Sequence, residues 1–193
     1  IAGDLCAVED MFALKLLMEK LGSKNIDCRQ DGSKLHPKNG RASYLFNSTI
    51  AGIEDADCLL IVGSNPRKEA PVLNARIRKR WLQGGLRVGL IGHEVDLTYP
   101  HRHLGNGADA LADLLSGQGA FAETLTKAKN PLIIVGAGLL ARPDGAALQR
   151  MTRLVAEKYN IVRPDWNGYN VLQNAASRVG GLEVRLAYFR GHG

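Results

Sequence analysis

Apolar positions along the chain follow two patterns, short continuous runs and longer stretches with helical spacing. Three strong runs each lead into a glycine, as buried parallel strands do where they turn toward a helix; they cover 57–63, 86–91 and 131–136. The stretches with helical spacing lie around these runs, at 10–21, 48–55, 71–83, 107–115, 121–129, 144–159 and 170–179. This alternation predicts an α/β fold, Rossmann-like, with a mostly parallel sheet flanked by helices.

The beginning of the chain departs from this pattern. Residues 1–3 resemble the last residues of a strand, and 25–28 is a further short strand candidate. Because the chain also opens without an initiator Met, we interpret residues 1–193 as a fragment of one larger domain. A division into two lobes, 1–128 and 129–193, is the alternative organisation.

Composition narrows the class of protein. Hydrophobic residues make up 45% and charged residues 23% of 193 positions, which is typical of a globular domain and not of a disordered one. The apolar runs are too short to cross a membrane, so direct membrane insertion is not expected. The net charge is +6, but the basic cluster lacks interleaved aromatic residues, which favours docking to an acidic protein over nucleic-acid binding. This cluster comprises Arg76, Arg78, Lys79, Arg80 and Arg87.

The most informative turn follows the first strong run and reads Gly63-Ser64-Asn65-Pro66. Ligands of open α/β sheets bind at the carboxyl ends of the strands, which is where this turn lies. The helical pattern over 71–83 then completes half of a nucleotide-type unit. The turn is therefore typical of a cofactor site, although no recognisable catalytic set surrounds it.

A second glycine turn follows the run at 131–136. Gly136, Gly138 and Ala141 match the dinucleotide pattern GxGxxA, in which glycines let a pyrophosphate approach a helix N-terminus. Here Asp144 is the expected N-cap of the next helix, and its carboxylate would stand where the phosphate belongs. A plain strand-to-helix turn is the preferred interpretation, with nucleotide binding as the alternative.

The remaining candidates for metal or acid–base chemistry are weak. Three cysteines form no CxxC pair, which argues against an iron–sulfur cluster or structural zinc in this chain and favours a reducing compartment. A histidine pair is expected in a loop, where surface hydrogen bonding is the simpler role, and an acidic group has no pocket partner. These residues are Cys6, Cys28 and Cys58, His101 and His103, and Glu54, Asp55 and Asp57. We predict no catalytic residue and no metal ligand.

Several spaced motifs resemble the molybdopterin oxidoreductase family. They include the turn Gly63-Ser64-Asn65-Pro66, which in that family lies along the pterin dinucleotide, and the segments 9–14, 22–27, 48–57 and 69–79. One branch is matched more closely, the large iron–sulfur subunit of NADH–quinone oxidoreductase, respiratory complex I. Its similarity rests on 74–79, 95–99, 103–105, 145–147 and 166–172. The resemblance extends over nearly the whole chain.

The resemblance implies a fold that has lost its cofactor. Active members carry a Cys, selenocysteine or Ser molybdenum ligand shortly after the strand at 25–28, but this loop lacks the family's ligand motif. Cys28 comes too early, and Ser33 is the remaining candidate. The turn Gly63, Ser64, Asn65 and Pro66 would then be a vestigial pterin loop, with no cofactor bound in this segment. The 2Fe-2S and 4Fe-4S clusters of the branch belong to a more N-terminal region, and FMN belongs to the parent complex.

Two functions follow from the resemblance. The first is a structural part of the complex I peripheral arm, which carries electrons from NADH to quinone coupled to ion translocation. Its partners would be the other hydrophilic subunits and the iron–sulfur region of the same subunit. The arm would lie on the cytoplasmic side of a bacterial inner membrane or on the mitochondrial matrix side. The alternative is an active, formate dehydrogenase-like molybdopterin enzyme in which Ser33 ligates the metal.

Surfaces that evolved to be covered are expected to carry exposed aromatic residues in such a segment. The candidates are Trp81, Trp166, Tyr169, Tyr188 and Phe189.

Overall fold

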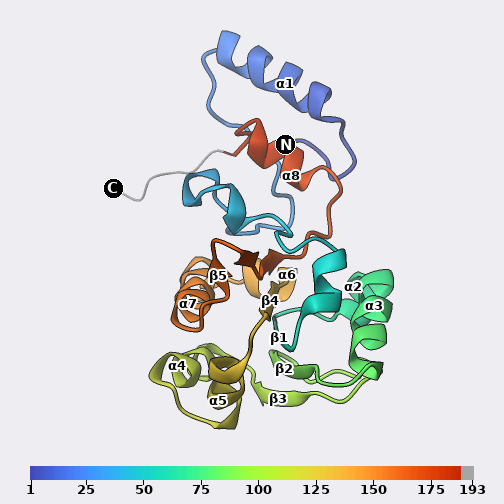
Figure 1. The fold of residues 1–193 in the computed structure, drawn as a ribbon. Coiled ribbons are helices and arrows are strands. Elements are labelled where there is room, and N and C mark those ends of the chain that lie inside the picture. Colours follow the sequence, from blue (N-terminus) through green and yellow to red (C-terminus); the bar gives the residue numbers. More distant parts are fainter. Residues whose placement is uncertain (188–193) are drawn as a thin grey trace.

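The computed structural model describes residues 1–187 of the chain (Figure 1). Its main sheet contains β1 (Cys58–Val62), β2 (Arg87–Ile91), β3 (Arg102–Gly105), β4 (Pro131–Val135) and β7 (Tyr169–Val171). A small antiparallel pair is formed by β5 (Val162–Arg163) and β6 (Trp166–Asn167). The longer helices are α1 (Val8–Lys20), α3 (Pro71–Leu82), α4 (Ala108–Ser116), α5 (Ala120–Lys127) and α7 (Gly145–Lys158). The shorter ones are α2 (Pro66–Glu69), α6 (Ala137–Leu140) and α8 (Arg178–Glu183), with 3-10 turns η1 (Pro37–Asn39), η2 (Arg41–Ser43) and η3 (Ala51–Asp55).

The five strands of the main sheet run parallel in the order β3-β2-β1-β4-β7. The central strand β1 pairs with β2 on one side and with β4 on the other, so the winding of the chain reverses between β1 and β4. The predicted α/β fold with a parallel sheet is confirmed. Such a reversal opens a crevice at the carboxyl ends of the two strands.

Both faces of the sheet are covered by helices, which explains the continuous apolar runs in the strands. Alternate side chains of β1 point to opposite faces. Leu59 and Ile61 pack with Ile77 of α3, whereas Leu60 belongs to the opposite layer together with Val155 of α7. No helix among the described residues has both the length and the apolar composition needed to cross a bilayer.

Above the sheet lies a second group of elements (Figure 1): α1, η1, η2 and α8, joined by long loops. Isolated bridges connect Asp27 with Ala187, and Phe46 with Asn170 of β7. The C-terminal part of the chain therefore returns to the segment at 25–28, which forms a single bridge and no extended strand.

Some local predictions are wrong. The expected helix at 170–179 is instead β7 followed by a loop, and α8 begins at Arg178, because this segment completes the edge of the sheet next to β4. Residues 1–3 form no strand. The histidine segment, expected as a loop, contains β3.

The aromatic residues also differ from expectation. Tyr169 is buried because its hydroxyl bonds to Thr152 inside the core, at 3.0 Å. Trp81 and Trp166 are half-buried, and the indole N–H of Trp166 donates to the Pro131 carbonyl at 2.8 Å. Tyr188 and Phe189 lie outside the described residues.

The two glycine turns pack directly against each other at the crevice. Gly63 has φ +63°, and a Cβ placed on it would lie 2.5 Å from the backbone nitrogen of Leu139 in α6. A Cβ on Gly136 would lie 2.3 Å from the Ser64 Cβ, and one on Gly138 would lie 2.7 Å from the Gly63 carbonyl oxygen. These glycines therefore allow backbone to meet backbone, and the GxGxxA pattern forms a strand-to-helix turn.

Gly63→Ala should destabilise the fold by about 3–5 kcal/mol, because the left-handed conformation and the overlap with Leu139 both oppose a methyl group. The matched control is Gly84→Ala, which has φ +82° and no atom within 4 Å of the added Cβ. It should lose only about 1–2 kcal/mol, the cost of the backbone conformation alone. Chemical denaturation measures both changes, and equal losses would contradict the close-packing role of Gly63.

Candidate functional site

A cavity of about 460 Å³ lies at the carboxyl ends of β1 and β2, beside the start of α6. The turn after β1 supplies Gly63, Ser64 and Asn65 to its wall, and the start of α6 supplies Gly138. The turn that the sequence predicts as a cofactor turn therefore forms part of the cavity wall. The other residues of the wall are those that a bound ligand would contact.

Two hydrogen-bond donors of the turn are used within the chain. The carboxylate of Glu69, at the end of α2, accepts from the Ser64 hydroxyl at 3.1 Å and from the Asn65 backbone N–H at 2.5 Å. Glu69 itself lines the cavity. A carboxylate in this place repels a phosphate group, so the turn carries its own anion where a dinucleotide would bring one.

Two further polar residues of the cavity wall, Arg142 and Asn65, also offer little to an anion. Arg142 lines the wall but is paired with Asp144 at 2.7 Å and 2.9 Å. The buried Oδ1 atom of Asn65 has no hydrogen-bond partner, and this atom is an acceptor. Asp144 does stand at the N-cap of α7, as predicted, although its side chain makes no capping hydrogen bond.

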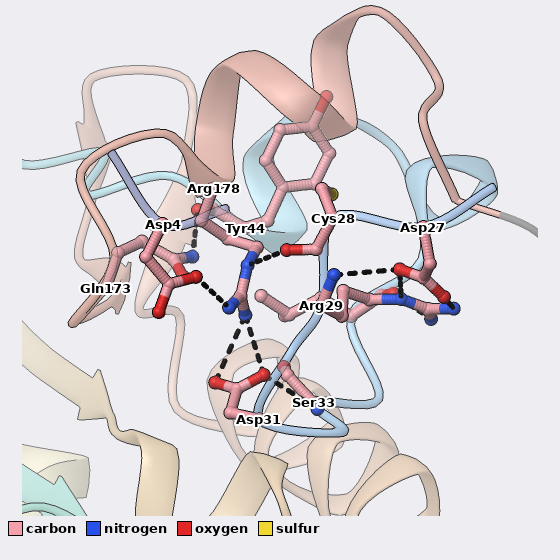
Figure 2. Close-up of polar contacts among 10 residues, drawn as sticks. Asp4, Asp27, Cys28, Arg29, Asp31, Ser33, Tyr44, Gln173 and Arg178 are labelled. Atoms are coloured by element: carbon pink, nitrogen blue, oxygen red, sulfur yellow. Dashed lines mark hydrogen bonds and ion pairs between the residues drawn. The ribbon is translucent and has the colours of Figure 1, made fainter. Parts of the chain in front are cut away.

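The loop that follows residues 25–28 is organised by a buried guanidinium (Figure 2). Arg178 of α8 is 2% exposed, and its Nε donates to the Cys28 carbonyl at 3.1 Å. Its Nη1 donates to both carboxylate oxygens of Asp31, at 2.9 Å and 3.1 Å, and its Nη2 lies 3.5 Å from a carboxylate oxygen of Asp4. A cation from within the chain therefore sits inside the loop that carries the metal ligand in active molybdopterin enzymes.

The loop is fixed at two further points (Figure 2). Arg29 turns back onto Asp27, with its Nε 2.9 Å from Oδ1, and the backbone N–H of Ser33 donates to Asp31 Oδ1 at 3.0 Å. Nearby, the Gln173 side chain donates to the Tyr44 carbonyl at 2.9 Å. The loop therefore has internal partners on both sides of Arg178.

Cys28 is held as a neutral thiol. Burial, together with the Asp27 carboxylate, raises the pKa of Cys28 to about 11. The side chain also packs on the backbone of α8, since a Cβ on Gly181 would lie 2.7 Å from the Cys28 sulfur. The Cys28 side chain is thus enclosed between its loop and α8.

Ser33 is buried at 3% exposure, and its hydroxyl has no hydrogen-bond partner. It does not line the cavity formed by the turn at Gly63. Among residues 1–187, no three His, Cys, Asp or Glu side chains are grouped so that they could hold a metal ion. The structure thus does not bring Ser33 and the turn together into one site.

The remaining candidates have structural partners. His103 Nε2 lies 2.7 Å from the Gly92 carbonyl, which joins β3 to the turn after β2. Asp57 accepts from the backbone N–H groups of Lys129 and Asn130, at 2.6 Å and 3.0 Å, and so joins the entrances of β1 and β4. His101 lies 3.4 Å from the Tyr99 carbonyl.

The basic cluster on α3 is partly neutralised. Glu54 forms ion pairs with Arg76 at 2.6 Å and with Lys79 at 3.1 Å. Arg78 donates to the Thr98 carbonyl and Arg80 to the Gly84 carbonyl. Most of this cluster therefore fastens α3 to neighbouring loops.

The groups of this chain that would bind a molybdopterin dinucleotide do not fit it. The turn that would hold its phosphates is bonded to Glu69, and the loop that would supply the metal ligand is bonded to Arg178. Sequence reasoning missed both residues. Glu69 has a weak local signal, an acid four residues after Asn65 that can reach back to the turn, whereas Arg178 has none because its partners are about 150 residues away.

The family profile and the relatives that match this chain agree with each other. The sequence profile described as molybdopterin oxidoreductase matches residues 1–189. The chain is 45% identical over 183 residues to an NADH-quinone oxidoreductase subunit of Rickettsia bellii, and the match covers 95% of this chain and 27% of that protein. It is 43% identical to the mitochondrial NADH dehydrogenase [ubiquinone] iron-sulfur protein 1 of Solanum tuberosum, over 96% of the chain and 25% of that protein.

A fungal relative and a solved structure extend this comparison. The mitochondrial NADH-ubiquinone oxidoreductase 78 kDa subunit of Neurospora crassa is 46% identical over 95% of the chain and 25% of that protein. The chain thus spans about a quarter of the length of these relatives. A formyltransferase/hydrolase complex from Methylorubrum extorquens has a chain that superposes with a TM-score of 0.58 at 21% identity. The match covers 93% of this chain and 56% of that one, and it supports the fold alone.

Arg178→Met should destabilise the fold by about 2–4 kcal/mol, since it leaves the Asp31 carboxylate and the Cys28 carbonyl without their partner. This loss of folding free energy should not exceed the loss from breaking a fully buried ion pair, because the Asp31 side chain is 37% exposed. The control Arg142→Met removes an ion pair between side chains that are 48% and 47% exposed, so it should destabilise the fold far less than Arg178→Met does. Equal losses of stability for the two variants in urea denaturation would contradict the conclusion that Arg178 organises this loop.

Alkaline pH should weaken the fold through its buried thiols. The ordinary pKa of a thiol is 9.0, and burial raises the pKa of Cys28 to about 11 and that of Cys58 to about 12. Between these values the unfolded chain has lost protons that the folded chain keeps, so stability falls as pH rises above 9, by about 1.4 kcal/mol per pH unit and thiol. Cys28→Ala should therefore show a shallower decline from pH 9 to 11 than the parent chain, and parallel curves would refute the buried neutral thiol.

Proposed function

Since this chain belongs to the molybdopterin oxidoreductase family, we propose that it is a structural part of the peripheral arm of an NADH–quinone oxidoreductase. Its relatives from Rickettsia, potato and Neurospora are all named as parts of NADH dehydrogenases that use a quinone, at 43–46% identity over at least 95% of the chain. Identity at this level along the whole chain is the observation that carries the proposal. In this role the parent complex oxidises NADH and reduces quinone, and this segment contributes to the scaffold.

We further propose that residues 1–193 form part of one domain and hold no redox centre. The sheet supports a single domain because β1 to β3 and β4 with β7, from the two sides of residue 128, pair in one continuous ladder. The buried Arg178 and the Glu69 carboxylate support the absence of a cofactor, since each uses groups that a molybdopterin would need. Iron–sulfur clusters would then lie in other parts of the parent subunit, and FMN elsewhere in the complex.

The partners in this proposal are other hydrophilic subunits and the iron–sulfur region of the same polypeptide. The complex would place this segment on the cytoplasmic side of a bacterial inner membrane, or on the matrix side in mitochondria. Relatives from both bacterial and mitochondrial sources support this pair of locations. Nucleic acid has no place in this function, because the basic residues of α3 serve internal contacts.

An active molybdenum enzyme is the second candidate, and one observation favours it. The Ser33 hydroxyl is buried and has no hydrogen-bond partner, as expected of a metal ligand when the metal is not bound. Against it stand two observations: Ser33 does not line the cavity, and the Arg178 guanidinium occupies the Asp31 carboxylate.

Ser33→Ala in the parent polypeptide distinguishes the two functions. A structural role predicts unchanged NADH–quinone reductase activity per assembled complex, with stability equal or up to about 2 kcal/mol higher, because an unsatisfied buried hydroxyl is removed. Gly63→Ala is the paired variant and should reduce the amount of assembled complex without changing activity per complex. Loss of activity per complex in Ser33→Ala, or failure of the polypeptide to purify with the reductase, would contradict the proposal.

A further inference from the structure

Exposed apolar side chains are concentrated at the beginning of the chain. Of the twelve large hydrophobic residues that are exposed in the described chain, seven lie within the first 21 positions, and the other five are spread over the rest. We call the seven the α1 surface: Ile1, Leu5, Val8, Phe12, Leu16, Leu17 and Leu21. A concentration of exposed apolar residues marks a place of contact, whereas single exposed apolar residues do not.

Helix α1 carries apolar residues beyond the one side that is covered. Met11 is its one fully buried residue, and it packs where α1 meets α8, near Gly180 and Gly181. On one flank of this contact lie Val8, Phe12 and Leu16, spaced four residues apart, and beyond the other flank lie Leu17 and Leu21. Figure 1 shows α1 as the outermost element, with α8 beneath it. An amphipathic helix normally buries its apolar residues, so the exposed apolar residues on the two flanks of α1 indicate a further contact.

We propose that the α1 surface is covered by polypeptide of the same parent subunit that lies outside residues 1–193. This inference rests on the proposed function, because it takes the parent to be built like the subunits that the chain resembles. It deepens that function by assigning the contact with the rest of the subunit to a defined surface.

The length of the relatives supports this occupant. The matched segment is 25–27% of each relative, so each carries roughly three times as much polypeptide outside it. Within the α1 surface, Ile1 is 81% exposed and Leu5 is 89% exposed.

The arrangement of the surface argues against a second copy of this chain. A symmetric partner helix would pack along one stripe of α1, as ridges pack into grooves. The apolar residues occur on two flanks of the α8 contact, so a symmetric pair would leave one flank in water. A longer polypeptide that passes on both sides of α1 covers both flanks.

Hydroxyl-radical footprinting of the unaltered parent subunit tests this directly, because it reports the solvent exposure of individual side chains. The subunit is oxidised in three states: isolated and native, isolated in urea, and assembled in its complex. Phe12, Leu16 and Leu17 should be oxidised about tenfold more slowly in the isolated native subunit than in urea, since core side chains retain little exposed surface. Protection should be independent of protein concentration and the same in the assembled complex.

Other outcomes overturn the inference in distinguishable ways. Oxidation at the urea rate in all states would mean that the α1 surface stays uncovered. Protection that appears only in the assembled complex would assign the surface to another subunit, and protection that grows with concentration would assign it to a second copy. The proposed function would survive each of these results, and it falls separately if the subunit does not purify with NADH–quinone reductase activity.

Discussion

One buried guanidinium joins parts of the chain that are far apart in sequence. Arg178 contacts Asp4, the Cys28 carbonyl and Asp31, and so fixes the N-terminal segment, the loop after 25–28 and α8 relative to one another. Burying such a charge is costly unless carboxylates and carbonyls satisfy it. Here they do, so the elements above the sheet depend on one cation that the chain itself provides.

The same principle operates at the crevice of the sheet. The turn after β1 and the start of α6 touch through their glycines, and the Glu69 carboxylate binds the free donors of the turn. The chain thus supplies an anion at the turn after β1 and a cation in the loop after residues 25–28. These two internal contacts support the proposal that the segment keeps the molybdopterin oxidoreductase fold without holding a cofactor.

The buried strands of the sheet could be predicted from the sequence alone. The apolar runs at 57–63 and 131–136 are buried strands because both faces of the sheet are covered, and a covered strand needs no alternation. The helix predicted at 170–179 was wrong. The apolar spacing of this short segment does not show that Tyr169 to Val171 pairs with β4 as the edge strand of the sheet. The turn at Gly63 was located from local pattern and resemblance. Arg178 was not, because a long-range ion pair leaves no local signal.

The metal content of the intact parent subunit, measured together with its pterin content, tests the central claim most directly. The account predicts iron, from clusters in other parts of the polypeptide, with molybdenum, tungsten and pterin far below one per chain. Stoichiometric molybdenum or tungsten with pterin would contradict it.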